Sequence, residues 1–164
     1  MANDLWRTPP EVIRWVEGKF GDIKVDLCAS AENKVCTLNI DEHMDFLDPL
    51  WIDTCHSIRG KNHWCNPPYS KPLPFVEMMA EWADNGYGVT TILNLDTSTK
   101  WFELIAALAT VICPIVGGRI SFLDGDGVAI KCNNKPQVIA YFSPYWKGRT
   151  MWEPVHISEI YGNE

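Results

Sequence analysis

The residues best suited to chemistry in this sequence are four consecutive ones, Asn66, Pro67, Pro68 and Tyr69. The Asn66 side-chain oxygen and the Pro67 main-chain carbonyl can each accept one hydrogen from an amino group. Two adjacent prolines fix two φ angles and lack N–H donors, so both acceptors are held in place with little internal competition. The ring of Tyr69 offers a surface on which a base extruded from a nucleic acid can stack.

This arrangement suits methyl transfer to the exocyclic amino group of adenine. The lone pair of that nitrogen is delocalised into the ring, which makes it a poor nucleophile. Two acceptors that draw the amino hydrogens out of the ring plane favour a more tetrahedral nitrogen, and they stabilise the positive charge that develops there. Taken alone, the tetrapeptide is equally consistent with an ordinary turn, because Asn and Pro are common turn residues.

The elements that would position the tetrapeptide alternate between helices and strands. Thr8 and Glu11 form a capping-box pattern before apolar residues at helical spacing, which predicts a helix over residues 9–20. Similar spacing predicts a helix over residues 73–83 and another after the turn at residues 96–99. Apolar, β-branched runs predict strands over residues 23–29, 35–40, 88–95 and 111–116, and residues 63–65 are expected to end one more strand.

Strands that alternate with helices predict an α/β fold with a mostly parallel sheet covered on both faces. Residues 119–123 and 137–142 look like two further strands joined by a glycine-rich, polar connection, which predicts a C-terminal antiparallel hairpin. Ligands of such sheets bind outside the carboxyl ends of the strands. Asp26, Asn66 and Asp96 are expected there, because each stands at the end of a predicted strand.

Length and composition indicate one globular domain spanning residues 1–164. The chain is 46% hydrophobic and 21% charged, which is ordinary for a folded domain. It begins without a secretory pattern and has no stretch long enough for a membrane span, so we expect a cytoplasmic protein with no membrane partner. The six cysteines are then expected to be reduced thiols.

The net charge of −7 argues against a nucleic-acid partner, since binding a polyanion normally requires a basic footprint. An enzyme that extrudes a single base can use a local basic rim instead. The side chains available for one are Lys61, Lys71, Lys100, Arg119, Lys131, Lys135, Lys147 and Arg149.

A metal site is not expected. Cys55, His56, His63 and Cys65 lie within a short stretch, but their order and spacing match no standard zinc module. A small zinc module built from these four residues remains an alternative.

Several motifs in one order resemble the phage-type DNA N6-adenine methyltransferase family. They cover most of the chain and are residues 6–9, 27–30 with Asn33, Asp45 with Leu47 and Trp51, 64–70, 96–102, and 118–122. The resemblance implies a Rossmann-like methyltransferase fold, S-adenosylmethionine as the methyl donor, and adenine in double-stranded DNA as the acceptor. It also implies a phage or prophage gene acting in a bacterial host cell.

The resemblance also implies roles for individual residues. Those implied to bind the cofactor are Thr8, Pro9, Asp26, Ala29 and Asp45, where Thr8 could equally be a helix cap and Asp41 competes with Asp45. The first cofactor motif departs from the broader superfamily, because no G-x-G turn occurs between Asp26 and Asn33.

Catalysis and target binding are implied for a second set of residues. The implied catalytic residues are Asn66, Pro67, Pro68 and Tyr69. The implied substrate contacts are Tyr69, Ser70, Asp96, Ser98 and Arg119, although Asp96 and Ser98 could instead form a turn and helix cap, and Arg119 an ion pair.

Two other functions fit the same residues. The tetrapeptide also occurs in methyltransferases that modify RNA bases or protein glutamine, and the acidic net charge favours these acceptors. The chain could also be a non-catalytic binding protein built on a methyltransferase scaffold.

Overall fold

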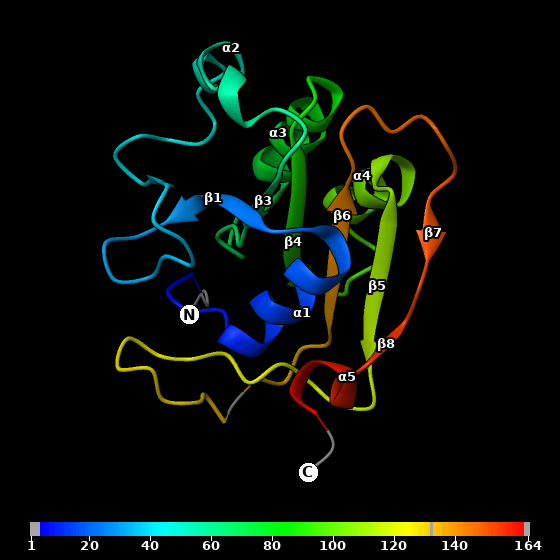
Figure 1. Cartoon of the computed structure of the whole chain (residues 1–164). Helices are drawn as coiled ribbons and strands as arrows, with labels where there is room; N and C mark the ends of the chain where they lie inside the picture. The colour runs from blue at the N-terminus through cyan, green and yellow to red at the C-terminus, as the bar shows by residue number, and fades with distance from the viewer. Residues whose placement is uncertain (1–3, 132, 163–164) are drawn as a thin grey trace.

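The described part of the chain, residues 4–131 and 133–162 of a computed structural model, contains one mixed sheet of eight strands (Figure 1). The strand order is β2-β1-β3-β4-β6-β5-β7, and β8 also pairs with β5. The strands are β1 (Ile23–Ala29), β2 (Asn39–Asp41), β3 (Asn62–Cys65), β4 (Gly88–Asn94), β5 (Val111–Val116), β6 (Gln137–Phe142), β7 (Met151–Trp152) and β8 (Val155–His156). Only β6 runs antiparallel to its neighbours, which confirms the mixed α/β fold with a mostly parallel sheet.

Helices cover both faces of the sheet. They are α1 (Pro10–Phe20), α2 (Leu50–Thr54), α3 (Leu73–Asp84), α4 (Lys100–Leu108) and α5 (Ile157–Tyr161), with a 3₁₀ turn at His56–Ile58. Val12 and Val16 of α1 are fully buried and pack with α5 on one face, whereas α3 and α4 pack on the other (Figure 1). Each helix buries one stripe of apolar residues in the core, which explains why the segments with apolar residues at helical spacing form these helices.

The sequence predicted most of the long elements correctly, but two local expectations were wrong. The capping box at Thr8 does not form: Pro9 occupies the N-cap position, and no side chain caps α1. The strand expected over residues 35–40 shrinks to Asn39–Asp41, because the Val35 N–H bonds to the Asp26 carboxylate instead of a neighbouring strand.

The predicted C-terminal hairpin is also wrong. Residues 119–123 form no strand, and β6 instead lies between β4 and β5, bonded antiparallel to both. The apolar alternation that suggested a strand serves packing, because Ile120 and Phe122 are buried in the core on the α1 side. Leu123 forms only isolated bridges, to Arg7 and Ala129.

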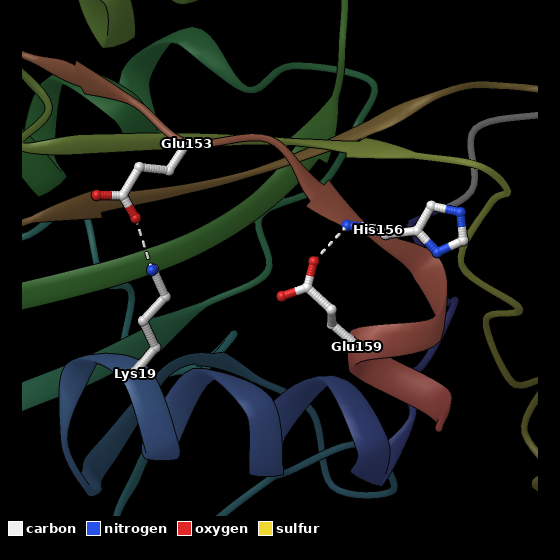
Figure 2. A network of polar contacts seen from close by, with 4 residues as sticks. All are labelled: Lys19, Glu153, His156 and Glu159. Atoms are coloured by element: carbon white, nitrogen blue, oxygen red, sulfur yellow. Dashed lines mark hydrogen bonds and ion pairs between the residues drawn. The ribbon is translucent and has the colours of Figure 1, made fainter. Parts of the chain in front are cut away.

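The C-terminal elements, which the sequence did not predict, are held by polar contacts (Figure 2). The Lys19 ammonium at the end of α1 donates to the Glu153 carboxylate over 2.6 Å, and this hydrogen bond raises the pKa of Lys19. The Glu159 side chain accepts the His156 N–H at 2.9 Å, which completes a capping box on α5. The partly exposed ion pair is expected to contribute about 0–1 kcal/mol.

Several buried polar side chains lack a hydrogen-bond partner among the described residues, and His63 is the titratable one. His63 in β3 is 0% exposed and packs against Trp82 and Tyr87, and neither of its ring nitrogens is hydrogen-bonded within the described residues. Burial, which disfavours the charged imidazolium, lowers the pKa of His63 to about 4.

We predict that His63→Leu makes the protein relatively more stable in acid. The unfolded chain takes up this proton near pH 6.5 and the native protein only near pH 4. The unfolded state therefore binds more protons in that window, and native stability is lost as the pH falls through it. Urea titrations should show the variant gaining roughly 3 kcal/mol relative to the wild type between about pH 7 and about pH 4.

The matched control is His56→Leu, because His56 is exposed. Because this variant keeps His63, its stability should fall in acid as that of the wild type does, and the difference between the two should change little with pH. A difference between His63→Leu and the wild type that stays constant from neutral to acidic pH would contradict the prediction.

Candidate active site

Asn66 is the first residue after β3 and presents an unused acceptor. Its amide nitrogen donates to the Trp6 carbonyl over 3.3 Å, which fixes the side chain at one end. Its amide oxygen is buried and has no hydrogen-bond partner in the described structure. Leaving a buried acceptor unpaired costs about 1–3 kcal/mol, so an unpaired acceptor at the carboxyl end of a strand is a candidate for binding a ligand.

The next residue supplies a second candidate acceptor. The Pro68 carbonyl accepts the Lys71 N–H at 3.3 Å, whereas no donor in the described part of the chain bonds to the Pro67 carbonyl. Neither proline has an N–H of its own to compete for these acceptors. The tetrapeptide thus leaves Asn66 and Pro67 with acceptor capacity at the carboxyl end of β3.

Tyr69 is fixed more firmly than the sequence indicated. Its hydroxyl donates to the Ile92 carbonyl in β4 over 3.3 Å, and burial raises its pKa. Its ring meets Phe122 edge-on, with the ring centroids 6.1 Å apart. The hydroxyl is therefore used inside the protein, and only the ring remains available for contact with a ligand.

Residues 4–9, called here the N-terminal strap, cross the carboxyl edge of the sheet and hold the tetrapeptide. Asp4 accepts hydrogen bonds from the main-chain N–H and the hydroxyl of Ser70, at 3.1 and 2.7 Å. The Trp6 ring packs on Phe122, with the ring centroids 5.6 Å apart. Arg7 and Leu123 exchange two main-chain hydrogen bonds, which form a two-bond bridge. The contacts of Asp4 and Phe122 with the site could not be predicted from sequence, because their partners are distant in the chain.

The strap also lines a pocket of about 380 Å³ beside the start of α1. Thr8 is 8% exposed, and its hydroxyl has no partner within the described residues. The other lining residues include Arg7, Asn33, Lys34 and Val35. Pro9, the N-cap of α1, is buried directly beside Thr8.

Asp26 lies within β1 rather than at the end of the strand as predicted. It is 3% exposed, and its carboxylate accepts the Cys28 N–H at 3.2 Å and the Val35 N–H at 3.0 Å. Burial raises the pKa of Asp26 to about 6, against the opposing effect of these two hydrogen bonds. Asp26 therefore ties the loop after β1 to the strand, and Ala29, which ends β1, is also buried.

The two competing candidate aspartates, Asp41 at the end of β2 and Asp45 after it, both stabilise turns. Asp45 is exposed, has a positive φ of 54°, and accepts the Leu47 N–H at 3.0 Å. The Asp41 carboxylate accepts the N–H groups of His43 and Met44. Each carboxylate oxygen has further lone pairs, so these contacts do not exclude a ligand role.

Apart from Tyr69 and Ser70, which follow β3, the predicted target contacts lie on the loops after β4 and β5. The Asp96 carboxylate accepts the hydroxyl and main-chain N–H of Ser98 at 2.6 and 3.1 Å, which lowers the pKa of Asp96. Thr99, not Ser98, caps α4. Arg119 is exposed, and no ion pair involves it within the described residues.

The structure gives no support to the zinc alternative. In residues 4–131 and 133–162, no three His, Cys, Asp or Glu side chains come close enough to hold a metal ion. The thiols of Cys28, Cys36, Cys55, Cys65 and Cys113 are free, and Cys132 lies outside the described residues.

None of the described helices is both long and apolar enough to cross a membrane.

The chain is an α/β protein with a mostly parallel sheet, and the buried, unpaired Asn66 oxygen lies at the edge where proteins of this class bind ligands. Comparison with known families narrows this class. The chain belongs to the family described as DNA N-6-adenine-methyltransferase (Dam), whose model matches residues 1–161.

Two curated relatives carry the name DNA N-6-adenine-methyltransferase. The relative from Escherichia phage T1 is 37% identical over an alignment of 153 residues, and the match covers 84% of this chain and 62% of the relative. The relative from Haemophilus phage HP1 is 37% identical over an alignment of 146 residues, and the match covers 87% of this chain and 80% of the relative. The chain thus spans less than two thirds of the length of the T1 protein.

Proposed function

We propose that this protein transfers a methyl group from S-adenosylmethionine to the N6 amino group of adenine in double-stranded DNA. The observation that carries the proposal is the buried, unpaired side-chain oxygen of Asn66. The family membership of the chain and the names of both phage relatives support DNA as the methyl acceptor over RNA or protein glutamine. They also favour an enzyme over a non-catalytic scaffold.

In this proposal Asn66 and Pro67 accept the two hydrogens of the target amino group. The Trp6 carbonyl holds the amide nitrogen of Asn66, so the oxygen stays oriented without a cost of reorganisation during the reaction. The buried setting strengthens both contacts as positive charge develops on the attacked nitrogen. No general base is required, because the charge can be relieved after methyl transfer by loss of a proton to water.

The pocket beside the strap fits a bound cofactor. Thr8 contributes a buried hydroxyl without a partner, and a ligand with a polar group would satisfy it. S-adenosylmethionine would supply the methyl group from its sulfonium. We propose that Thr8 and Pro9, with Asp26, Ala29 and Asp45, hold it beside the carboxyl edge, in a Rossmann-like methyltransferase fold.

The turn after β1 replaces the missing glycine-rich turn of the broader superfamily. Ser30 and Asn33 exchange two main-chain hydrogen bonds, at 3.0 and 3.2 Å, and the Ser30 hydroxyl also accepts the Asn33 N–H. This closed turn lets the chain reverse beside the pocket without glycine. Asn33 lines that pocket.

For the acceptor, we propose that a flipped adenine stacks on the Tyr69 ring. Ser70, Asp96, Ser98 and Arg119 would surround the entrance on neighbouring loops. The phage relatives favour a gene of phage or prophage origin acting on DNA in a bacterial cell. The cytoplasm of that host is the proposed location.

We predict that Asn66→Ala lowers methyl transfer at least about a hundredfold while leaving donor affinity nearly unchanged. Asn66→Asp should lose a similar factor, because a carboxylate cannot donate to the Trp6 carbonyl. Labelled S-adenosylmethionine with unmethylated duplex DNA, followed by digestion to nucleosides, gives the rate and the product. Calorimetric titration with S-adenosylmethionine gives donor affinity.

Asn85→Ala is the matched control, since the Asn85 side chain donates only to the Glu81 carbonyl at the end of α3. It should retain wild-type activity. Undiminished turnover by Asn66→Ala would contradict the proposed role of Asn66. Label appearing in RNA or protein but not in DNA would contradict the acceptor.

We predict that Thr8→Val weakens S-adenosylmethionine binding roughly tenfold, the effect of about 1.4 kcal/mol, without destabilising the protein. Thr91→Val is a close control, because the Thr91 hydroxyl in β4 is likewise buried without a partner but does not line the pocket. Both variants should be at least as stable as the wild type. Equal donor affinity in the two variants would argue against cofactor binding beside Thr8.

A further inference from the structure

Residues 117–136, called here the cross-edge segment, join β5 to β6, and the described residues among them, 117–131 and 133–136, form no helix and no strand of the sheet. In Figure 1 the segment, largely yellow, leaves the end of β5 and passes the N-terminal strap. A connection of this length without secondary structure is uncommon in a compact domain unless it has a function.

The cross-edge segment is fastened by a polar network around Gln137, which is 0% exposed. The Gln137 amide oxygen accepts the Ile120 N–H at 3.3 Å, and its amide nitrogen donates to the Lys135 carbonyl at 2.6 Å. Asn133 closes the network by donating to the Ile120 carbonyl at 2.9 Å. Both ends of the segment are therefore joined to the same buried residue.

The middle of the segment contacts the candidate active site. Phe122 is fully buried and packs against both Trp6 and Tyr69. Leu123 forms the two-bond bridge to Arg7 of the N-terminal strap. The side of the cross-edge segment that carries Phe122 thus packs behind the tetrapeptide. This packing fixes the position of the segment, and of its exposed side, relative to Asn66.

The outer side carries basic residues that the protein itself does not neutralise. Arg119, Lys131 and Lys135 are exposed, and no ion pair within the described residues involves them. Lys71, on the loop after β3, and Lys100, at the start of α4, have the same properties. Lys135 lies near enough to Asp96, on the loop after β4, to lower its pKa.

The acids of the segment offset this charge only in part. The Asp124 carboxylate accepts the N–H groups of Asp126 and Val128 and so closes its own turn. Asp126 remains exposed. The segment thus carries Arg119, Lys131 and Lys135 against Asp124 and Asp126. In a chain with a net charge of −7, this local excess of basic charge is the kind of footprint that binding to a polyanion requires.

We propose that the cross-edge segment docks duplex DNA through its backbone phosphates, with Lys131 and Lys135 as the principal contacts and Lys71 and Lys100 extending the footprint. The inference rests on the proposed DNA methylation. A basic segment fastened to Gln137 and to the N-terminal strap would hold the duplex so that one extruded adenine reaches the acceptors. Phosphate contacts of this kind position the enzyme but carry no sequence information.

The test compares two double variants that remove equal charge from one face each. Lys131→Ala/Lys135→Ala removes the footprint, whereas Lys61→Ala/Arg149→Ala removes two exposed cations near the amino ends of β3 and β7. Fluorescence anisotropy with a labelled unmethylated duplex measures affinity over a range of salt concentrations. Steady-state assays give the KM for DNA and kcat, and calorimetry gives affinity for S-adenosylmethionine.

The footprint variant should lose about 2 from the slope of log affinity against log salt, since each lost phosphate contact removes about 0.9. Its KM for DNA should rise about tenfold or more, with kcat at saturating DNA and donor affinity near wild type. Lys131→Arg/Lys135→Arg should restore the slope and the KM. The Lys61/Arg149 control should stay close to wild type.

Equal salt slopes for the footprint and control variants would overturn the proposal while leaving DNA methylation intact. A failure of Lys131→Arg/Lys135→Arg to restore affinity would also overturn it, because the loss would then not be one of charge. Failure of the proposed function has a different signature, namely that the wild-type protein transfers no label to DNA.

Discussion

The hydrogen bond from the Asn66 amide nitrogen to the Trp6 carbonyl is the contact on which the candidate site depends. This bond fixes which end of the amide faces Trp6, so the oxygen points the other way, and that oxygen is buried without a partner in the described residues. The surroundings maintain the arrangement: Asp4 holds Ser70, Phe122 packs between Trp6 and Tyr69, and the two prolines offer no competing donors. The site is therefore prepared by contacts between distant parts of the chain.

Long periodic segments of the fold could be predicted from sequence, because their burial pattern is local. The predicted strand over residues 111–116 and helix over 73–83 appear with nearly the same bounds. The two-residue strand β7 and the five-residue helix α5 could not be predicted, since such short elements depend on pairing with β5 and packing against α1. The apolar alternation at residues 119–123 led to a wrong strand prediction, because the buried side chains there face the core although the backbone pairs with no strand.

The candidate site divides in a similar way. Asn66, Pro67 and Tyr69 were identifiable because their chemistry lies in one tetrapeptide and its motif context. Sequence could not show which of these polar groups are free to bind a ligand. The Ser70 hydroxyl donates to Asp4 and the Tyr69 hydroxyl to the Ile92 carbonyl, whereas the Thr8 hydroxyl has no partner within the described residues. Hydrogen-bond satisfaction depends on partners from other elements, so local sequence does not reveal it.

The most direct test of the central claim is a crystal structure of the protein with a duplex containing its target adenine and a non-reactive analogue of the donor. We expect the N6 nitrogen of an extruded adenine to lie within hydrogen-bond distance, about 2.7–3.2 Å, of the Asn66 side-chain oxygen, with the Asn66–Trp6 bond intact. An extruded adenine whose amino group bonds elsewhere, with the Asn66 oxygen still unpaired, would contradict the account.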